Sequence, residues 1–282
     1  PAEALAVAAR LRTAAGLDDD AGPDALAELP LKDLMRAYKK VATGLMDFGP
    51  VVDGAIVPHQ PFSRESVALN GDKPLIMGDM DTEASLFLFP RREEIEALGR
   101  DGIVERLSGA VGRAAAQRLV GAVEDSRPGI GPYELAVRIV SGELFAVPAR
   151  TGAEARATGA GAPTWRYRNV LRTPAVDGAL MSPHELDVAL VFGNVDTAVG
   201  LNGGTAGARG VSRILGAAWA AFARTGSPLC QEVPDWPPYD RDRAVLLIGP
   251  SPALAADVDG EVLNAAAAAD AAPVDWFTAL LP

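Results

Sequence analysis

The chain has 282 residues, of which 49% are apolar, so it is long enough to bury a sizeable core as one large domain or two small ones. Its net charge of −11 argues against nucleic acid and anionic membrane surfaces as partners, because both need basic patches. Cys230 is the sole cysteine, which excludes an internal disulfide and a cysteine-rich zinc site. No apolar run approaches the ~20 residues of a membrane-spanning helix.

Helical periodicity marks the first part of the chain and its middle. Apolar spacing predicts helices over residues 2–16 and 31–41. Proline and glycine punctuate residues 48–54, which indicates a loop, a brief strand and a turn. Composition and periodicity then predict long helical stretches over residues 92–122 and 132–159.

Three segments are predicted as strands, namely residues 73–78, 164–170 and 244–248. Because they alternate with helices, we expect an α/β architecture, with a mostly parallel sheet flanked by helices. Three strands are few for this length, so we expect part of a sheet. The loop at residues 79–85 follows a predicted parallel strand, a usual place for a site, and it carries three carboxylates. A solvated acidic loop is the alternative interpretation.

A histidine opens the next informative stretch. His184 is one of only two histidines, and residues 184–194 run through apolar positions into a Phe-Gly-Asn turn. A catalytic base and a structural histidine both fit that position. The glycine-rich residues 200–210 match no phosphate-binding pattern and are expected to be a flexible connection. Residues 211–224 are predicted as a helix with an apolar stripe in the core, and the low-complexity end of the chain predicts no element.

Five short motifs, in order, resemble segments of the type B carboxylesterases, the family that includes bacterial para-nitrobenzyl esterases and the cholinesterases. The motifs are Pro-Val-Val-Asp-Gly at residues 50–54, Leu-Ile-Met-Gly at 75–78 with Thr-Glu-Ala-Ser-Leu-Phe at 82–87, the histidine run at 184–194, residues 219–228, and Trp-Pro-Pro-Tyr-Asp at 236–240. Each is short, but their common order over residues ~1–250 is specific. The resemblance implies an α/β-hydrolase fold and ester hydrolysis by a Ser-Glu-His triad.

The resemblance implies that His184 is the general base and Glu83 the acid that orients it. Physical chemistry supports such a pair, because a serine hydroxyl needs an adjacent imidazole to take its proton. A buried carboxylate then fixes the tautomer and stabilises the imidazolium. The order Ser, acid, His is that of the α/β hydrolases. Asp79 and Asp81, in the same loop as Glu83, are the rival acids.

Four further side chains have expected places. By the same resemblance, Leu86 and Phe87 line the substrate pocket, although simple core packing is an equal alternative for both. Asp187, three residues after the histidine, is expected as a hydrogen-bond partner behind the site. The second histidine, His59, is expected to be exposed and without a catalytic role.

The chain departs from the family in what it lacks. It contains no G-x-S-x-G, since of its ten serines only Ser212 and Ser251 have a glycine two residues before them and neither has one two residues after. The glycine-rich oxyanion-hole segment is also missing. In the acid motif Thr82 and Ala84 stand where the family has Asp and Gly. These departures imply the C-terminal half of a carboxylesterase, with Pro1 aligned shortly after the nucleophile.

We therefore expect one part-domain over residues 1–282. It comprises a helical segment and loop at 1–70, the acid- and histidine-bearing sheet and helices at 71–250, and a tail at 251–282. The expected partners are a small ester substrate and an N-terminal half carrying the serine, without which the chain should be unstable or oligomeric. No cofactor or metal is implied. An inactive truncated product and a non-catalytic binding relative are the alternatives, and the compartment stays open.

Overall fold

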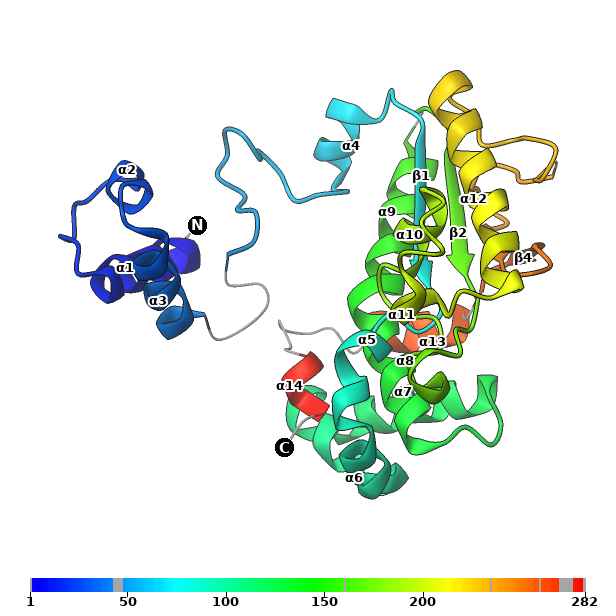
Figure 1. The fold of residues 1–282 in the computed structure, drawn as a ribbon, viewed down its shortest axis with the longest axis horizontal. Coiled ribbons are helices and arrows are strands. Elements are labelled where there is room, and N and C mark those ends of the chain that lie inside the picture. The colour runs from blue at the N-terminus through cyan, green and yellow to red at the C-terminus, as the bar shows by residue number, and fades with distance from the viewer. Residues whose placement is uncertain are drawn as a thin grey trace. The chain divides into compact units, whose positions relative to one another are not determined.

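The computed structural model describes residues 2–42, 48–159, 161–233, 235–258, 260–268 and 276–280. The chain divides into two compact units, Pro1–Ser66 and Val67–Pro282 (Figure 1). Among the described residues, no helix is both long enough and apolar enough to cross a membrane.

The first unit contains the two helices that periodicity predicts. Helix α1 (Ala2–Ala15) packs on α3 (Leu31–Val41), with the short α2 (Pro23–Ala27) between them. The brief strand expected within residues 48–54 is wrong, because the chain there forms a side-chain-stabilised turn. One carboxylate oxygen of Asp53 accepts the backbone N–H groups of Ala55, Ile56 and Val57, each at 2.9 Å. Such a bond pattern replaces a strand ladder.

The second unit is built on a four-stranded sheet of order β1-β2-β3-β4. Its strands are β1 (Leu75–Met80), β2 (Thr164–Asn169), β3 (Ala244–Ile248) and β4 (Ala253–Ala256). The first three are parallel, as predicted, while β4 is antiparallel and was not expected. Strand β1 ends two residues beyond its predicted end, at Met80, so Asp79 belongs to the strand and not to the loop.

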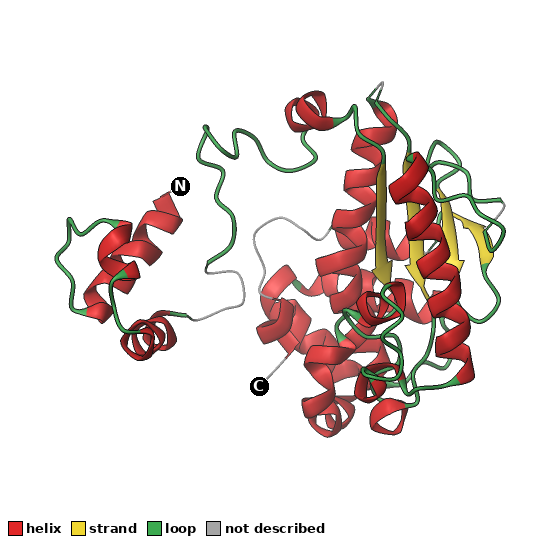
Figure 2. Cartoon of the chain, turned by 45° about the horizontal axis from the view of Figure 1, so that its top comes forward, coloured by secondary structure: helices red, strands yellow, loops and turns green. Residues whose placement is uncertain are grey.

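Helices cover both faces of this sheet, and the alternation of side chains along β2 explains how (Figures 1 and 2). On one face Trp165 and Tyr167 pack with the stripe of α12 (Ala206–Thr225). On the opposite face Arg166 and Arg168 lie toward α9 (Val147–Thr158). Helix α12 begins five residues earlier than predicted, because Thr205 caps it by accepting the Ala208 N–H at 3.0 Å.

A cluster of helices forms a second core beside the sheet. It contains α6 (Arg92–Val111), α7 (Arg113–Ser126), α8 (Pro132–Ser141) and the π-helical segment η2 (Gly142–Ala146). The predicted helical stretch over residues 92–122 is divided at Gly112, whose φ of 80° ends α6 and starts α7. The predicted helix over 132–159 is likewise interrupted by η2 before α9.

The end of the chain belongs to this second core. Helices α13 (Gly260–Ala267) and α14 (Trp276–Leu280) bury Val262, Ala266, Trp276 and Leu280 against the helical cluster. The low-complexity composition is uninformative about these elements. Pro1, Pro234 and tail residues 269–275 and 281–282 lie outside the described residues. The remaining short elements are α4 (Arg64–Asn70), α5 (Ser85–Leu88), η1 (Phe89–Arg91), η3 (Ala175–Gly178), α10 (Leu186–Val191) and α11 (Val199–Asn202).

Candidate active site

The acid-bearing turn follows β1 directly. The strand ends at Met80, and its backbone N–H donates to Oε1 of Glu83 at 2.7 Å, which folds the carboxylate back over the strand end. The backbone N–H of Ala84 donates to the Ser141 hydroxyl of α8 at 3.0 Å. Glu83 is therefore fixed by its own strand, and the turn that carries it is fixed by the helical cluster.

The structure brings His184 to this carboxylate. Nδ1 of the imidazole lies 2.6 Å from Oε2 of Glu83, and the backbone N–H of His184 donates to the Glu83 carbonyl at 3.2 Å. The Glu83 side chain is 6% exposed, whereas that of His184 is 34% exposed. The carboxylate is thus enclosed while the imidazole remains partly open, and among the described residues its other ring nitrogen has no hydrogen-bond partner.

The backbone around His184 is shaped by its neighbours. Ser182 donates its hydroxyl to the Asn169 carbonyl at the end of β2, at 2.8 Å, and Ser85 donates to the Leu180 carbonyl. Immediately after the histidine, Glu185 adopts a left-handed φ of 64° and serves as the N-cap residue of α10. A non-glycine residue in this conformation persists only where surrounding contacts impose it.

Each partner changes the acidity of the other. Burial raises the pKa of Glu83, and the hydrogen bonds from His184 and the Met80 amide oppose that rise. The hydrogen bond with Glu83 raises the pKa of His184, and the carboxylate charge acts in the same direction against burial. A carboxylate on Nδ1 therefore favours the protonated imidazolium, which is the state that a general base must reach after taking a proton.

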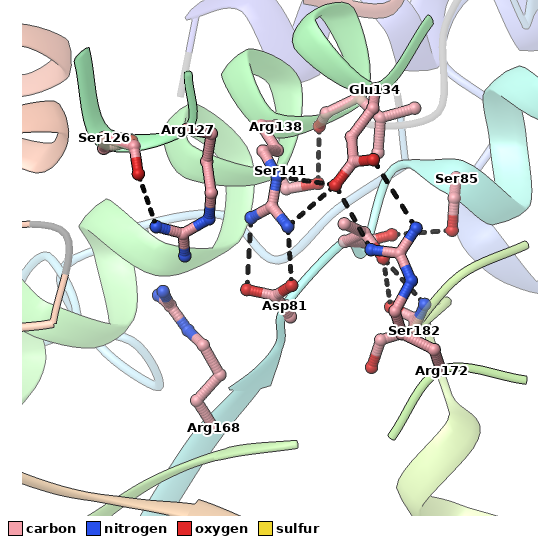
Figure 3. A network of polar contacts seen from close by, with 12 residues as sticks. Asp81, Ser85, Ser126, Arg127, Glu134, Arg138, Ser141, Arg168, Arg172 and Ser182 are labelled. Atoms are coloured by element: carbon pink, nitrogen blue, oxygen red, sulfur yellow. Dashed lines mark hydrogen bonds and ion pairs between the residues drawn. The ribbon is translucent and has the colours of Figure 1, made fainter. Parts of the chain in front are cut away.

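The two rival carboxylates are engaged elsewhere. Asp79 is 2% exposed and accepts from Arg166 Nη2 and Arg168 Nε, each at 2.7 Å. Asp81 accepts from both terminal nitrogens of Arg138, at 3.2 and 2.8 Å (Figure 3). Arg138 lowers the pKa of Asp81 although burial acts to raise it. Of the three carboxylates, Glu83 is the one bonded to the histidine.

Two aromatic rings lie against the imidazole. The Phe87 ring centroid is 5.5 Å from that of His184, and the Phe145 centroid is 5.0 Å from it. Phe87 was expected at the site, whereas Phe145 was missed because it lay inside a predicted continuous helix. Its position depends on η2, and π-helical segments are often found at functional sites. Pro148 just beyond it was the available signal of an interruption.

The other expected residues lie as follows. Leu86 is partly buried in α5 beside Phe87. Asp187, in the first turn of α10, accepts a hydrogen bond from the Tyr167 hydroxyl. Its partner is therefore a residue of β2 and not the imidazole. His59 is exposed in the first unit, as expected.

A mostly parallel sheet covered on both faces, with a carboxylate–histidine pair beyond the ends of its strands, is the arrangement of the α/β hydrolases. The sequence matches the carboxylesterase family over residues 4–265, and the chain therefore belongs to that family. The resemblance to type B carboxylesterases and the expected partial α/β-hydrolase fold are both confirmed.

Individual relatives agree with this assignment. The chain is 31% identical over 222 residues to phenmedipham hydrolase of Pseudarthrobacter oxydans, covering 77% of this chain and 43% of that protein. It is 27% identical over 224 residues to para-nitrobenzyl esterase of Bacillus subtilis, covering 78% of this chain and 43% of that one.

Solved structures show the same fold. A Geobacillus stearothermophilus carboxylesterase matches 93% of this chain with a TM-score of 0.73 at 24% identity, and 54% of its own length is covered. A para-nitrobenzyl esterase matches 94% of this chain with a TM-score of 0.69 at 23% identity, again over 54% of its length. The chain thus spans about half the length of the relatives it matches.

Proposed function

We propose that this chain supplies the acid and the base of a serine carboxylesterase, and that the nucleophilic serine comes from an N-terminal half. The observation that carries the proposal is the 2.6 Å contact between Nδ1 of His184 and Oε2 of Glu83. Family membership supports hydrolysis of carboxylic esters as the reaction class.

The roles follow from which ring nitrogen is occupied. With Nδ1 held by Glu83, Nε2 of His184 is the nitrogen that takes the proton from the serine hydroxyl as it attacks the ester carbonyl. The imidazolium then gives that proton to the leaving alkoxide, and the sequence repeats with water to release the acid. Glu83 stays ionised throughout, orients the ring and stabilises its positive charge.

The substrate class is inferred from the rings beside the base. Phe87 and Phe145 both contact the imidazole, so the reacting carbonyl sits next to apolar surface. This favours small esters with apolar acyl or alcohol groups. Leu86, in the same short helix as Phe87, belongs to this lining.

The requirement for a second half rests on two observations. The sequence holds no G-x-S-x-G, so the strained turn that exposes the serine is not in this chain. In addition, β1 is the first strand of the sheet order and, within the part of the chain that is described, pairs only with β2. An open parallel edge next to the acid turn is a place where a strand of the N-terminal half can pair.

The test is hydrolysis of a short-chain para-nitrophenyl ester. The chain is assayed alone and together with an N-terminal half that carries the serine, with His184→Ala beside each. Activity in the combination only, abolished by the substitution, is the expected result. Activity of the chain alone would mean that another residue attacks the ester. No activity in the combination would favour the alternatives, an inactive truncated product or a binding relative.

A further inference from the structure

Beneath the histidine loop, one tyrosine of the sheet reaches the first turn of α10. Tyr167 lies in β2, is 5% exposed, and donates its hydroxyl to Oδ2 of Asp187. Asp187 follows His184 by three residues, and only the left-handed Glu185 and Leu186 separate the two. The hydroxyl therefore connects the sheet to the helix that starts immediately after the candidate base.

The ring of Tyr167 reaches this position through a space that Gly78 provides. Gly78 is the register partner of Tyr167 on β1. A Cβ added at Gly78 would lie 2.1 to 2.3 Å from three atoms of the tyrosine ring, closer than non-bonded atoms approach. The ring therefore lies flat over β1, the strand that leads to Glu83, and a side chain at position 78 would displace it.

Further packing holds the ring rigidly. Trp219 and Trp236 meet it edge to face, with centroids 5.1 and 6.5 Å away. Trp236 is itself fixed by its indole N–H, which donates to the Arg166 carbonyl of β2 at 2.9 Å. Burial first, and then the Asp187 carboxylate, raise the pKa of Tyr167, so that its phenol remains a donor.

We propose that Tyr167 is a positioning residue for His184. It acts through Asp187, which it holds against the sheet, and thereby sets where the histidine loop meets Glu83; Gly78 provides the space that the arrangement requires. The inference rests on the proposed function for its catalytic meaning, since a misplacement of about 1 Å can reduce a rate 10²-fold. Independently of that function, the inference concerns only the position of the His184 imidazole.

The primary test is the downfield proton NMR signal of the His184 Nδ1–H, which reports the hydrogen bond to Glu83 without requiring activity. Tyr167→Phe keeps the ring and removes only the hydroxyl. We expect the signal to broaden beyond detection or shift, while circular dichroism shows the fold retained. Tyr239→Phe is the matched control, because Tyr239 is also 5% exposed but packs on the opposite face of the sheet.

A double-mutant cycle tests the route through Asp187. Asp187→Ala should reproduce the effect of Tyr167→Phe, and the double variant should be no worse than either, because both remove the same hydrogen bond. An Nδ1–H signal unchanged by Tyr167→Phe would overturn the proposal. Equal loss of that signal in Tyr167→Phe and Tyr239→Phe would also overturn it. A signal missing from the unmodified chain, while circular dichroism shows that chain to be folded, would contradict both the positioning role of Tyr167 and the Glu83–His184 pair.

Kinetics of the combined halves provide the second readout and separate the two proposals. Tyr167→Phe should reduce kcat about 10- to 100-fold with little change in KM, since it misplaces the base and touches no substrate. A rise in KM at unchanged kcat would overturn the positioning role. If the NMR signal behaves as expected but no combination hydrolyses esters, the proposed function fails and the positioning inference stands.

Discussion

Thr82 and Ser182, 100 residues apart in sequence, bind each other through three hydrogen bonds. The Ser182 N–H donates to the Thr82 hydroxyl at 2.7 Å, and that hydroxyl donates to the Ser182 carbonyl at 3.0 Å. The Thr82 N–H donates to the same carbonyl at 3.2 Å. Both side chains are fully buried. Thr82, one of the two residues that depart from the family's acid motif, therefore joins the acid turn to the histidine loop.

This relationship predicts that Thr82→Val destabilises the chain by about 1–3 kcal/mol, because a buried N–H of the histidine loop loses its acceptor. Valine keeps the shape of threonine, so packing is little changed. Urea unfolding measures the effect as a lower midpoint at unchanged m. Thr82→Ser is the matched control, since it keeps the hydroxyl and loses one methyl group. Equal midpoints for the two variants would contradict the account.

A second prediction concerns the acidity of the base. Glu83→Gln removes the negative charge and weakens the hydrogen bond that raise the pKa of His184, so that pKa should fall toward its ordinary value near 6.5. Histidine NMR titration measures it, with His59 as an internal reference in the same spectrum. An unchanged His184 titration would show that Glu83 is not its partner in solution.

The same substitution should also shift the pH–rate profile in a defined direction. Under the proposed function the neutral imidazole is the active base, so the rate of the combined halves should rise with pH through the pKa of His184. In Glu83→Gln the acid limb of the pH profile should move to lower pH while kcat falls, on the order of 10⁴-fold, as in triads whose orienting carboxylate becomes an amide. A limb that stays in place would assign the pH dependence to another group.

A third prediction tests the ring that the sequence did not reveal. Phe145 lies 5.0 Å from the imidazole between ring centroids, so its ring current contributes to the chemical shifts of the His184 ring protons. Phe145→Ala should move those shifts. Phe89→Ala, which removes a ring packed on the helical core instead, should leave them unchanged. Similar spectra for the two variants would place Phe145 away from the base in solution.

A fourth prediction concerns the ion pair beside the acid turn. Arg138 and Asp81 are 10% and 13% exposed and form two parallel hydrogen bonds. Arg138→Met leaves a nearly buried carboxylate without its main partner and should cost about 3–5 kcal/mol of unfolding free energy. Arg100→Met breaks an exposed pair with Glu124 and should cost less than about 1 kcal/mol.

The pH dependence of this fourth effect has a defined direction. The pKa of Asp81 is lowered in the folded chain, so its pairing stabilises the fold above the ordinary carboxyl pKa and is lost as pH falls through the folded-state value. The gap in thermal stability between Arg138→Met and the unmodified chain should therefore narrow in acid. A gap that is constant from neutral pH down to about pH 3 would contradict the assigned pairing.

The strands and helices whose apolar or aromatic residues follow a regular spacing could be predicted from the sequence alone. The apolar runs of β1 and β3 and the stripe of α12 could be predicted because burial on both faces of a parallel sheet requires them. Strand β2 could be predicted because its aromatic residues alternate with arginines. The fourth strand could not, since Ala253–Ala256 is short, mostly exposed and made of weak strand formers. The alanine-rich α13 carries too few large apolar residues to reveal that it packs in the core.

At the site, sequence order suggested the carboxylate and the histidine but not their surroundings. Glu83 was distinguished from Asp79 and Asp81 by resemblance alone. In the structure, arginines from β2 and α8 form hydrogen bonds with the Asp79 and Asp81 carboxylates. Those partners come from residues 50 to 90 positions away, which no local pattern encodes. The position of Phe145 depends on a π-helical segment, for which Pro148 just beyond it was the available signal in the sequence.

Under the proposed function, His184 activates a serine that this chain does not carry. A fluorophosphonate probe tests it most directly, because an activated serine oxygen displaces fluoride from phosphorus and keeps the label. We expect labelling of the N-terminal half when the two halves are combined. We expect no labelling when this chain carries His184→Ala. Labelling of this chain by itself, or labelling of the combination that survives His184→Ala, would contradict it.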